Sequence, residues 1–598
     1  MNDNQKIVYD TELPEIESMQ HVFYQYEINT EDDLGEVYLE LYQDFPFHTQ
    51  EIQRLGSIIR LFKSKCFTIV AEGDYVDKQY RDSYYTYFSQ KHEEYERNCV
   101  RLVFFEGKIT PENFADYKFD LKKILIGCVV LRPLNVGNIG QTLLDPQKLD
   151  VEGYYRTCKF NIMIYGRKLD INAFPYSSQD GETMTCAETA LFNLIDYYGN
   201  KYSEYRVLMP SEILQDIERE SYERVLPSQG VYEANIAKVL SDAHFYPKIY
   251  AYDKKFKSIL YAYVESGIPL ILLLPEHVVL CVGHGKIQQN MEREEIYKLA
   301  YSLKADETEY QLLSTADVCY EYIVMDDNKP PYFKTTLDSI VAEYAENAEY
   351  AENVENSLED VKNNEVSIIV PLYRRIFIDA ARADSIFKSY FWENNFFLED
   401  IRKSYGDMTW GMKKDNPFVW RMYLTASRSY KDFKTRTTKN EQLKHFYMDC
   451  ALPRFIWVLE ITTIKDYANS KARVEVLLDA TSSPYNDTKG IISIGYKGHF
   501  VYVPDELYNK CENDIENEDE YFNESGEILN AMQEFKQLFN RNLVLTKVFN
   551  ILYDNTYQYF DETFEIFENS NLERNFEYGT CEYCGAKATE TKDGIKEI

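Results

Sequence analysis

The chain has 598 residues, of which 45% are hydrophobic, and it carries a formal net charge of −34. A chain of this length is expected to form about three to four domains, and its hydrophobic content is sufficient for real cores. The acidity excludes non-specific binding to nucleic acid, which needs a basic surface, and disfavours binding to anionic membranes.

The sequence predicts a cytoplasmic protein without a membrane partner. Residues 1–17 are polar and acidic and lack the basic and apolar regions of a signal peptide. The apolar run 268–274 is far shorter than a membrane-spanning helix. The 11 cysteines are odd in number and scattered, which is typical of reduced cytoplasmic thiols rather than of a disulfide framework.

Residues 1–165 predict a separate N-terminal α/β domain. Its patterns indicate helices over 34–62 and 75–96 and strands over 66–70, 100–105 and 124–131. We interpret this unit as a structural or recognition domain that packs against the unit following it.

The stretch 174–199, FPYSSQDGETMTCAETALFNLIDYYG, begins with turn-forming residues and continues as a helix. Thr185 and Glu188 have the spacing of a capping box, and apolar residues then recur at helical spacing up to Gly199. Cys186 is therefore predicted at the first helical position, where the helix dipole stabilises a thiolate. The same pattern also fits a small apolar residue at a helix start, so this stretch alone leaves a structural role open.

Two buried strands with polar ends follow this helix. Patterns between them and the helix indicate further helices over 210–220, 230–243 and 256–265 and a short strand over 245–252. The stretch 267–285, GIPLILLLPEHVVLCVGHG, then contains two apolar runs, and the second begins at His277. After a polar segment, 286–320, another apolar strand ends in Asp326 and Asp327. A histidine at the start of a strand often has only a structural role. Here, however, the chain contains in order a cysteine at the start of a helix, a histidine at the start of a strand and a carboxylate at the end of a strand.

The rest of the chain predicts an acidic linker, a second domain and a tail. Residues 333–365 contain the hexamer AEYAEN twice and predict an acidic, low-complexity linker that is a solvated helix or loop, with binding of a protein partner as the alternative. Residues 366–575 predict a mixed, largely antiparallel α+β domain, with strands over 367–372, 455–461, 473–478, 491–496 and 500–503 and helices over 376–391 and 529–560.

The tail, 576–598, carries one C-x-x-C pair, Cys581 and Cys584. A zinc ribbon needs two such pairs, so we interpret these residues as free thiols. A zinc site shared between subunits is the alternative. No cofactor is expected anywhere in the chain.

The arrangement over residues 166–332 resembles the papain-like cysteine peptidases and is most similar to the compact C39 peptidases of bacteria. The resemblance implies that Cys186 is the nucleophile and that Gln179 is the oxyanion-hole glutamine. The string His277-Val-Val-Leu-Cys-Val-Gly-His-Gly resembles the histidine strand of the family. Asp326 or Asp327 would orient the imidazole, and alignment on the family's strand favours Asp327.

Three features depart from the family pattern. The C-G-S-C-W-type signature of papain and the D-C-G of many C39 domains are absent from the sequence. Gln179 lies one position farther from Cys186 than is usual. The polar segment 286–320 widens the gap between His277 and the aspartates, which makes the third member the hardest to assign.

The predicted chemistry also follows from the residues themselves. A thiolate attacks a carbonyl, a histidine holds it as an ion pair and protonates the leaving amine, and a carboxylate fixes the imidazole. The sequence therefore predicts an α+β protein with a papain-like core, cutting a peptide or isopeptide bond of a protein or peptide substrate through an acyl-cysteine. Two alternatives remain: acyl transfer or deamidation of the transglutaminase kind, and a non-catalytic interaction scaffold.

Overall fold

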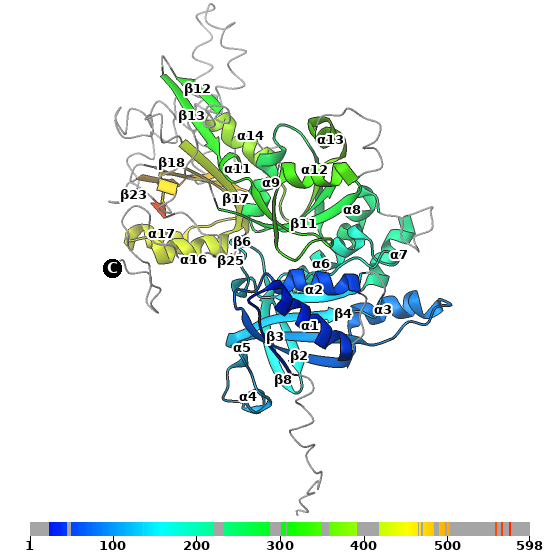
Figure 1. Cartoon of the computed structure of the whole chain (residues 1–598). Coiled ribbons are helices and arrows are strands. Elements are labelled where there is room, and N and C mark those ends of the chain that lie inside the picture. The colour runs from blue at the N-terminus through cyan, green and yellow to red at the C-terminus, as the bar shows by residue number, and fades with distance from the viewer. Residues whose placement is uncertain are drawn as a thin grey trace, which may run out of the picture.

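The structure is a computed structural model of the chain. It describes residues 23–44, 49–134, 137–220, 226, 231–286, 301–305, 308–347, 358–391, 418–439, 441–463, 466–467, 471–483, 490–496, 499–502, 557–558, 564–565 and 573–575. Within these ranges the fold is mixed α+β, with helices packed on mostly antiparallel sheets (Figure 1). None of the helices in these ranges combines the length and the hydropathy that a membrane span requires.

The first sheet is antiparallel throughout, and its strands follow one another in chain order. The strands are β1 (Phe23–Glu27), β2 (Cys66–Tyr75), β3 (Cys99–Glu106), β4 (Leu125–Leu131) and β5 (Ile139–Leu144). Its helices are α1 (Glu31–Asp44), α2 (Thr49–Ile59), α3 (Lys78–Thr86), α4 (Pro111–Ala115) and α5 (Leu121–Ile124). The predicted α/β character of this unit is thus corrected to α+β, because neighbouring strands that follow directly along the chain run in opposite directions. The helix expected over 75–96 is also shorter, since α3 ends at Thr86.

The second sheet lies at the centre of the molecule and is antiparallel. Its strands run in the order β15-β14-β11-β10-β16-β9, and β6 pairs with β11 beside them. They are β6 (Gly153–Tyr155), β9 (Tyr246–Ala251), β10 (Leu270–Leu274), β11 (His277–His284), β14 (Glu321–Met325), β15 (Phe333–Thr336), β16 (Ser367–Leu372) and β25 (Glu573–Asn575), which pairs with β6. The helices around this sheet are α6 (Cys186–Lys201), α7 (Pro210–Glu220), α8 (Glu233–Asp242) and α9 (Phe256–Glu265).

Both faces of the β10–β11 hairpin are buried. Alternate residues of β11, such as Val278 and Leu280, belong to the hydrophobic core that contains α6 and the first sheet. The residues between them, such as Val279 and Cys281, belong to the core that contains α9. This alternation is what the pleat of a strand produces, and it explains why the hairpin sequence is apolar without interruption.

Strand pairing crosses the domain boundaries that the sequence predicts. The hairpin of β7 (Cys158–Ile164) and β8 (Arg167–Ala173) spans the boundary expected at residue 165. Strand β16, expected in the C-terminal domain, pairs with β10 and β9 of the central sheet. Pairing partners far apart along the chain leave no local signal in the sequence, so these boundaries could not be placed from it.

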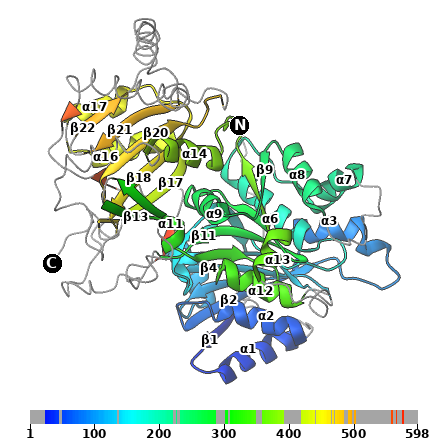
Figure 2. The ribbon, with the colours of Figure 1, turned by 90° about the horizontal axis from the view of Figure 1, so that it is seen from above.

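The third sheet runs in the order β12-β13-β17-β18-β20-β21-β22-β23 and is antiparallel except between β13 and β17. Its strands are β12 (Tyr301–Ala305), β13 (Thr308–Ser314), β17 (Phe418–Ala426), β18 (Phe455–Thr463), β20 (Val474–Asp479), β21 (Ile491–Tyr496), β22 (His499–Tyr502) and β23 (Tyr557–Gln558). Helices α11 (Thr315–Val318), α14 (Ala380–Phe391), α16 (Ser427–Thr437) and α17 (Glu441–Asp449) accompany it, and β19 (Lys471–Ala472) pairs with β24 (Phe564–Glu565). Figure 2 shows this sheet, with β13 in green and β18, β20 and β21 in yellow and orange, beside the part that holds the other two.

A buried arginine joins the third sheet to the centre of the molecule. Arg421 on β17 lies between Glu265 of α9, with Nε 2.9 Å from Oε1, and Glu460 of β18, with Nη1 2.7 Å from Oε2. Strand β17 itself was not predicted. The polar segment 286–320, which widens the gap between His277 and the aspartates, contributes β12 and β13 to this sheet, while β11 and β14 still pair directly.

The described parts of 333–365 are folded, which corrects the predicted solvated linker. They form β15, α12 (Leu337–Asn347) and α13 (Leu358–Glu365). Leu337, Ile340 and Val341 of α12 are buried in the core that contains α9, because apolar residues at helical spacing precede the acidic repeat. The first AEYAEN copy forms the second half of this helix. The second copy lies outside the described residues, as do Cys581, Cys584 and nearly all of the helix predicted over 529–560.

Candidate active site

Cys186 is the first residue of α6, as the sequence predicts. The carboxylate of Glu188 accepts hydrogen bonds from the backbone N–H of Thr185, at 3.1 Å, and from its hydroxyl group. Cys186 is half-buried, whereas the next twelve residues of the helix, Ala187 to Tyr198, are buried. The thiol is therefore the exposed start of a helix that is otherwise inside the core, although the helix continues to Lys201, past the predicted stop at Gly199.

The loop before Cys186 is held by an aspartate that also shapes its turn. The Oδ1 atom of Asp180 accepts hydrogen bonds from the backbone N–H groups of Glu182 at 2.9 Å, Thr183 at 2.7 Å and Met184 at 2.9 Å. From the sequence, Asp180 is predicted only as one of the turn-forming residues at the start of the stretch 174–199. Its position, between Gln179 and the helix, fixes the path of the chain from the predicted oxyanion residue to the nucleophile.

Two residues of the connection between β4 and β5 of the first sheet support this loop. The buried guanidinium of Arg132 donates to the carbonyl oxygens of Ser178, at 2.8 Å, and Ile139, at 3.1 Å. Gly137 has a φ of +68°, and a Cβ atom there would lie 1.8 Å from the carbonyl oxygen of Gln179. Only glycine fits such a close approach at positive φ. The N-terminal unit thus positions the site, and no local motif in the sequence indicates this.

His277 is the first residue of β11 and is in contact with the other predicted site residues. Its Nε2 atom lies 3.0 Å from Oδ1 of Asp326 and 3.4 Å from Oδ1 of Asp327. The side chain of Cys186 interacts with the same imidazole and helps to raise its pKa. Because Nε2 faces the aspartates, Nδ1 is the ring nitrogen available to the thiol. The structure therefore brings together the cysteine, the histidine and both candidate carboxylates.

Asp326, rather than the favoured Asp327, is the carboxylate hydrogen-bonded to His277. If the strand continued through both residues, its side chains would alternate and only one aspartate could face the histidine. Strand β14 ends at Met325, however, and residues 326–329 form a turn closed by the backbone N–H of Lys329 on the carbonyl of Asp326, at 3.0 Å. Alternation does not hold in a turn, so both carboxylates reach Nε2.

A tyrosine of α12 completes the surroundings of the histidine. The ring of Tyr344 stacks on the imidazole of His277, and its hydroxyl group donates to Oδ2 of Asp326 at 2.7 Å. The backbone N–H of Asn328 donates to Oδ1 of the same aspartate at 2.9 Å. Asp326 is thus fixed from three sides. Tyr344 lies in the acidic repeat, and low-complexity sequence gives no indication of such a role.

The glutamine loop and the aspartate turn also contact each other. The side-chain Nε2 of Gln179 donates to Oδ1 of Asn328 at 3.4 Å, which is a long and therefore weak hydrogen bond. The hydroxyl group of Tyr176 donates to the carbonyl oxygen of Lys329 at 2.6 Å. Gln179 is half-buried, so its amide lies at the solvent side of the site near the turn that carries the aspartates.

The electrostatics of this cluster favour a charged pair. Burial alone would lower the pKa of His277, but its hydrogen bonds to Asp326 and Cys186 and the charges of both aspartates raise it to about 10. Burial alone would raise the pKa of Asp326, but His277 and the hydrogen bond from Tyr344 hold it below its usual value. Asp327 differs: burial and the charge of Asp326 raise its pKa to about 6, although the His277 charge opposes this. At neutral pH His277 is therefore an imidazolium beside an ionised Asp326.

Two other cysteines in the described part of the chain are less suited to react. Cys281 is 1% exposed, and burial raises its pKa to about 12, so it is a poor nucleophile. Cys319 lies with Sγ 3.6 Å from Nδ1 of His284, whose Nε2 is 3.0 Å from Oε2 of Glu265. This second group also contains a thiol, an imidazole and a carboxylate in sequence. Cys319 is fully buried, however, and no substrate can reach it.

The histidine and the two aspartates offer ligand atoms within 4.8 Å of one another, the usual composition of a metal site. The same imidazole interacts with the Cys186 side chain, so these groups also provide the arrangement that proton transfer between a thiol and an imidazole requires.

Comparisons of this chain with family models, with curated proteins and with solved structures found no match. The assignment of a function consequently depends on the residues and the geometry described above. What the fold and the site define is a mixed α+β protein with a half-buried thiol, an imidazolium and a carboxylate in contact at the start of a buried helix.

Proposed function

We propose that the chain is a thiol hydrolase of the papain-like kind, which cleaves a peptide or isopeptide bond through an acyl-cysteine intermediate. One observation carries this proposal: the imidazole of His277 contacts the Cys186 thiol on one side and the Asp326 carboxylate on the other. A thiol, an imidazole and a carboxylate in this order are the parts that nucleophilic catalysis by cysteine requires.

In the first half of the reaction, the Cys186 sulfur attacks the carbonyl carbon of the scissile bond as a thiolate. The proton that it has given to His277 passes to the leaving nitrogen, and the amine departs while a thioester remains on Cys186. Asp326 holds the ring through Nε2 and stabilises its positive charge, while Tyr344 packed on the ring face limits its rotation.

Negative charge develops on the carbonyl oxygen during the attack and needs hydrogen-bond donors. The backbone N–H of Cys186 lies in the first turn of α6, where N–H groups have no partner within the helix. The amide of Gln179 is the second donor in this proposal, and its weak hydrogen bond to Asn328 allows it to turn toward the substrate. Asp180, Arg132 and Gly137 keep the loop in place.

In the second half, a water molecule attacks the thioester. His277 removes a proton from this water, the carbon–sulfur bond breaks, and the sulfur leaves as the thiolate beside the imidazolium. The products are a carboxylic acid and the free enzyme. Acyl transfer differs only in that an amine replaces the water, and deamidation differs only in that the leaving group is ammonia.

A peptide library incubated in water labelled with heavy oxygen tests this proposal and separates it from the alternatives. Hydrolysis predicts new C-termini that carry the label, deamidation predicts labelled glutamate in place of glutamine, and transfer predicts amides when a primary amine is added. Cys186→Ala should abolish each of them. If the unmodified chain produces none of the three products under any condition, the protein is the non-catalytic scaffold.

A further inference from the structure

The imidazole of His277 has one more carboxylate beside it than the proposed reaction needs. A single carboxylate is sufficient to orient the ring and to stabilise its charge. Asp326 does this here, with Oδ1 3.0 Å from Nε2, and it is itself fixed by hydrogen bonds from the Asn328 backbone and the Tyr344 hydroxyl group. Asp327 nevertheless places Oδ1 3.4 Å from the same nitrogen. The second carboxylate therefore calls for an explanation of its own.

Asp327 is buried without hydrogen-bond donors. Its side chain is 4% exposed, and neither Oδ1 nor Oδ2 accepts a hydrogen bond of good geometry from another residue that the structure describes. The guanidinium of Arg54 acts on this carboxylate electrostatically, but more weakly than His277 does. Buried carboxylates in proteins are either satisfied by several donors or bind a cation. The two oxygens of Asp327 are thus available as ligand atoms.

The spacing of the three side chains is that of a metal site. His277, Asp326 and Asp327 each offer one ligand atom within 4.8 Å of the others, and the two carboxylate oxygens lie 3.0 Å and 3.4 Å from Nε2. Zn²⁺ binds nitrogen and carboxylate oxygen at about 2.0–2.2 Å, so two ligand atoms of a tetrahedral ion are about 3.3–3.6 Å apart. Small movements of the side chains therefore admit an ion between them. The donors that fix Asp326 are of the kind that hold ligating carboxylates in metal sites.

The turn that carries the two aspartates is open to solvent. Asn328, which directly follows Asp327, is exposed, and Gln179 beside it is half-buried. An ion can therefore reach the carboxylates from this side. The thiol of Cys186 is expected on the other side of the ring, at Nδ1, so it is not needed as a ligand. Three protein ligands leave the fourth position of the ion to a water molecule, as in open zinc sites.

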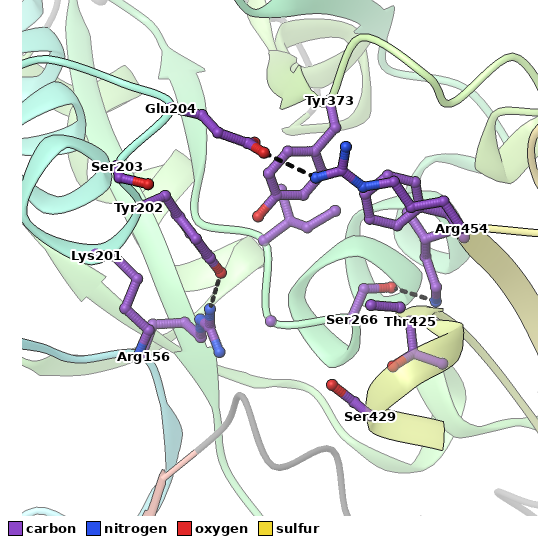
Figure 3. Close-up of a pocket in the computed structure, with 15 residues that line it drawn as sticks. Arg156, Lys201, Tyr202, Ser203, Glu204, Ser266, Tyr373, Thr425, Ser429 and Arg454 are labelled. Atoms are coloured by element: carbon purple, nitrogen blue, oxygen red, sulfur yellow. Dashed lines mark hydrogen bonds and ion pairs between the residues drawn. The ribbon is translucent and has the colours of Figure 1, made fainter. Parts of the chain in front are cut away.

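A cavity at the other end of α6 is a poor site for a cation. It has a volume of about 380 Å³, and the 16 residues of α6 place it about 24 Å from the thiol. Among the described residues, its lining contains three basic side chains, Arg156, Lys201 and Arg454, and one acidic side chain, Glu204 (Figure 3). Glu204 pairs with Arg454 at 2.9 Å. It provides a control carboxylate remote from His277.

We infer that His277, Asp326 and Asp327 bind a divalent transition-metal ion of the Zn²⁺ class at Nε2, and that the bound ion reversibly switches off the thiol. The mixture of one imidazole nitrogen and carboxylate oxygens favours Zn²⁺ over Mg²⁺ and Ca²⁺, which take nearly all of their ligands from oxygen. The site is the candidate active site itself, so the ion and a reacting substrate exclude each other.

The inhibition follows from the two nitrogens of the ring. A neutral imidazole has one nitrogen with a hydrogen and one with a lone pair. When the ion uses the lone pair of Nε2, the hydrogen is on Nδ1, and the ring cannot take the proton of the Cys186 thiol. Removal of the ion restores this capacity. The inhibition rests on the proposed function, whereas the binding of the ion does not.

Isothermal titration with Zn²⁺ tests the binding. The titration uses the full chain with Cys581→Ser and Cys584→Ser, so that the tail thiols do not contribute, after treatment with a chelator and dialysis. Zn²⁺ should bind saturably with a Kd below about 10 μM. Mg²⁺ should bind at least about 100-fold more weakly.

Variants in the same background locate the ion. Asp327→Asn should weaken Zn²⁺ binding at least about tenfold. Cys186→Ala should bind Zn²⁺ within about threefold of the unmodified affinity, because the thiol is not a ligand. The matched control is Glu204→Gln, which also replaces a carboxylate by an amide and should bind normally. An unchanged circular dichroism spectrum checks that the variants are folded. No binding of Zn²⁺, normal binding by Asp327→Asn, or loss of binding in Cys186→Ala would each overturn the site.

Product formation from the peptide library tests the inhibition. Saturating Zn²⁺ should lower it at least about tenfold, and an excess of chelator should restore it. Binding of Zn²⁺ with unchanged product formation would overturn the regulatory part of the inference. Absence of product even in the chelator would contradict the proposed function instead, and the titration would still decide whether the metal site exists.

Discussion

The phenol ring of Tyr344 lies almost parallel to the imidazole of His277, with ring centroids 4.0 Å apart and an angle of 17° between the planes. The same tyrosine donates from its hydroxyl group to Asp326, the carboxylate that holds the imidazole. One side chain of α12 thus contacts two members of the candidate triad. Helix α12, which contains the first copy of the acidic repeat, therefore also supplies a residue of the candidate site.

Tyr344→Phe separates the two contacts, because it keeps the ring and removes the hydroxyl group. The hydroxyl helps to lower the pKa of Asp326, so its loss should raise that pKa and move the acidic limb of the pH–rate profile to higher pH. Turnover at neutral pH should fall about three- to tenfold. Tyr232→Phe, which changes an exposed tyrosine, is the matched control. If the pH–rate profile of Tyr344→Phe is the same as that of the unmodified chain, the tyrosine contributes only the packing of its ring.

Replacing each aspartate by asparagine distinguishes their roles. Asp326→Asn should lower turnover by at least about 100-fold, because the amide neither stabilises the imidazolium nor fixes its tautomer. Asp327→Asn should cost about tenfold or less, since its oxygen lies farther from Nε2, at 3.4 Å against 3.0 Å. The measurement is the initial rate of product formation for both variants at neutral pH. The reverse order of effects would assign the orienting role to Asp327, as the strand alignment suggested.

The raised pKa of Asp327 predicts a specific dependence of stability on pH. A carboxyl group titrates near about 3.9 in an unfolded chain and at about 6 here, so between these values the folded state binds more protons. The free energy of unfolding therefore loses a contribution from this group as pH rises from about 4 to 6. Asp327→Asn removes that loss. Relative to the unmodified chain, it should gain on the order of 3 kcal/mol between pH 4 and 8 in denaturant titrations. A constant difference between the two proteins would show that Asp327 is not shifted.

Gly137→Ala tests whether the first sheet positions the oxyanion donor. A methyl group there would collide with the backbone of Gln179, so the loop must move. Turnover should fall about 10- to 100-fold, while alkylation of Cys186 should change little, because the thiol and His277 are on other elements. Gly35→Ala is the control, since a Cβ atom at that position of α1 meets no atom within 4 Å. Normal turnover in Gly137→Ala would mean that Gln179 takes no part.

Local signals in the sequence were sufficient for some of these elements. The capping-box spacing and the helical periodicity predicted the start of α6 at Cys186, and the bounds of α7, α9 and β16 agree with the predicted ones. These elements are defined by turns, caps and periodic apolar residues, all of which are local.

The parts that sequence reasoning missed depend on contacts between distant residues. The pairing of β16 with β9 and β10 and of β13 with β17 leaves no local trace. Alignment on the family's strand favoured Asp327, but β14 ends at Met325, so both aspartates lie in the turn beyond the strand and the alignment could not distinguish them. Tyr344 and Arg132 act across the interior from segments that carry no recognisable motif.

The most direct measurement of the central claim is limited alkylation of the thiols at mildly acidic pH, about 5.5, followed by peptide mapping. The raised pKa of His277 keeps its imidazole positively charged at this pH, and a charged imidazole favours the thiolate form of a neighbouring cysteine. Cys186 should be labelled before every other cysteine, and His277→Ala should slow its labelling at least about tenfold. If Cys581 or Cys584 is labelled first, or if the rate at Cys186 is the same in His277→Ala, the thiol is not activated by the histidine and the catalytic account is wrong.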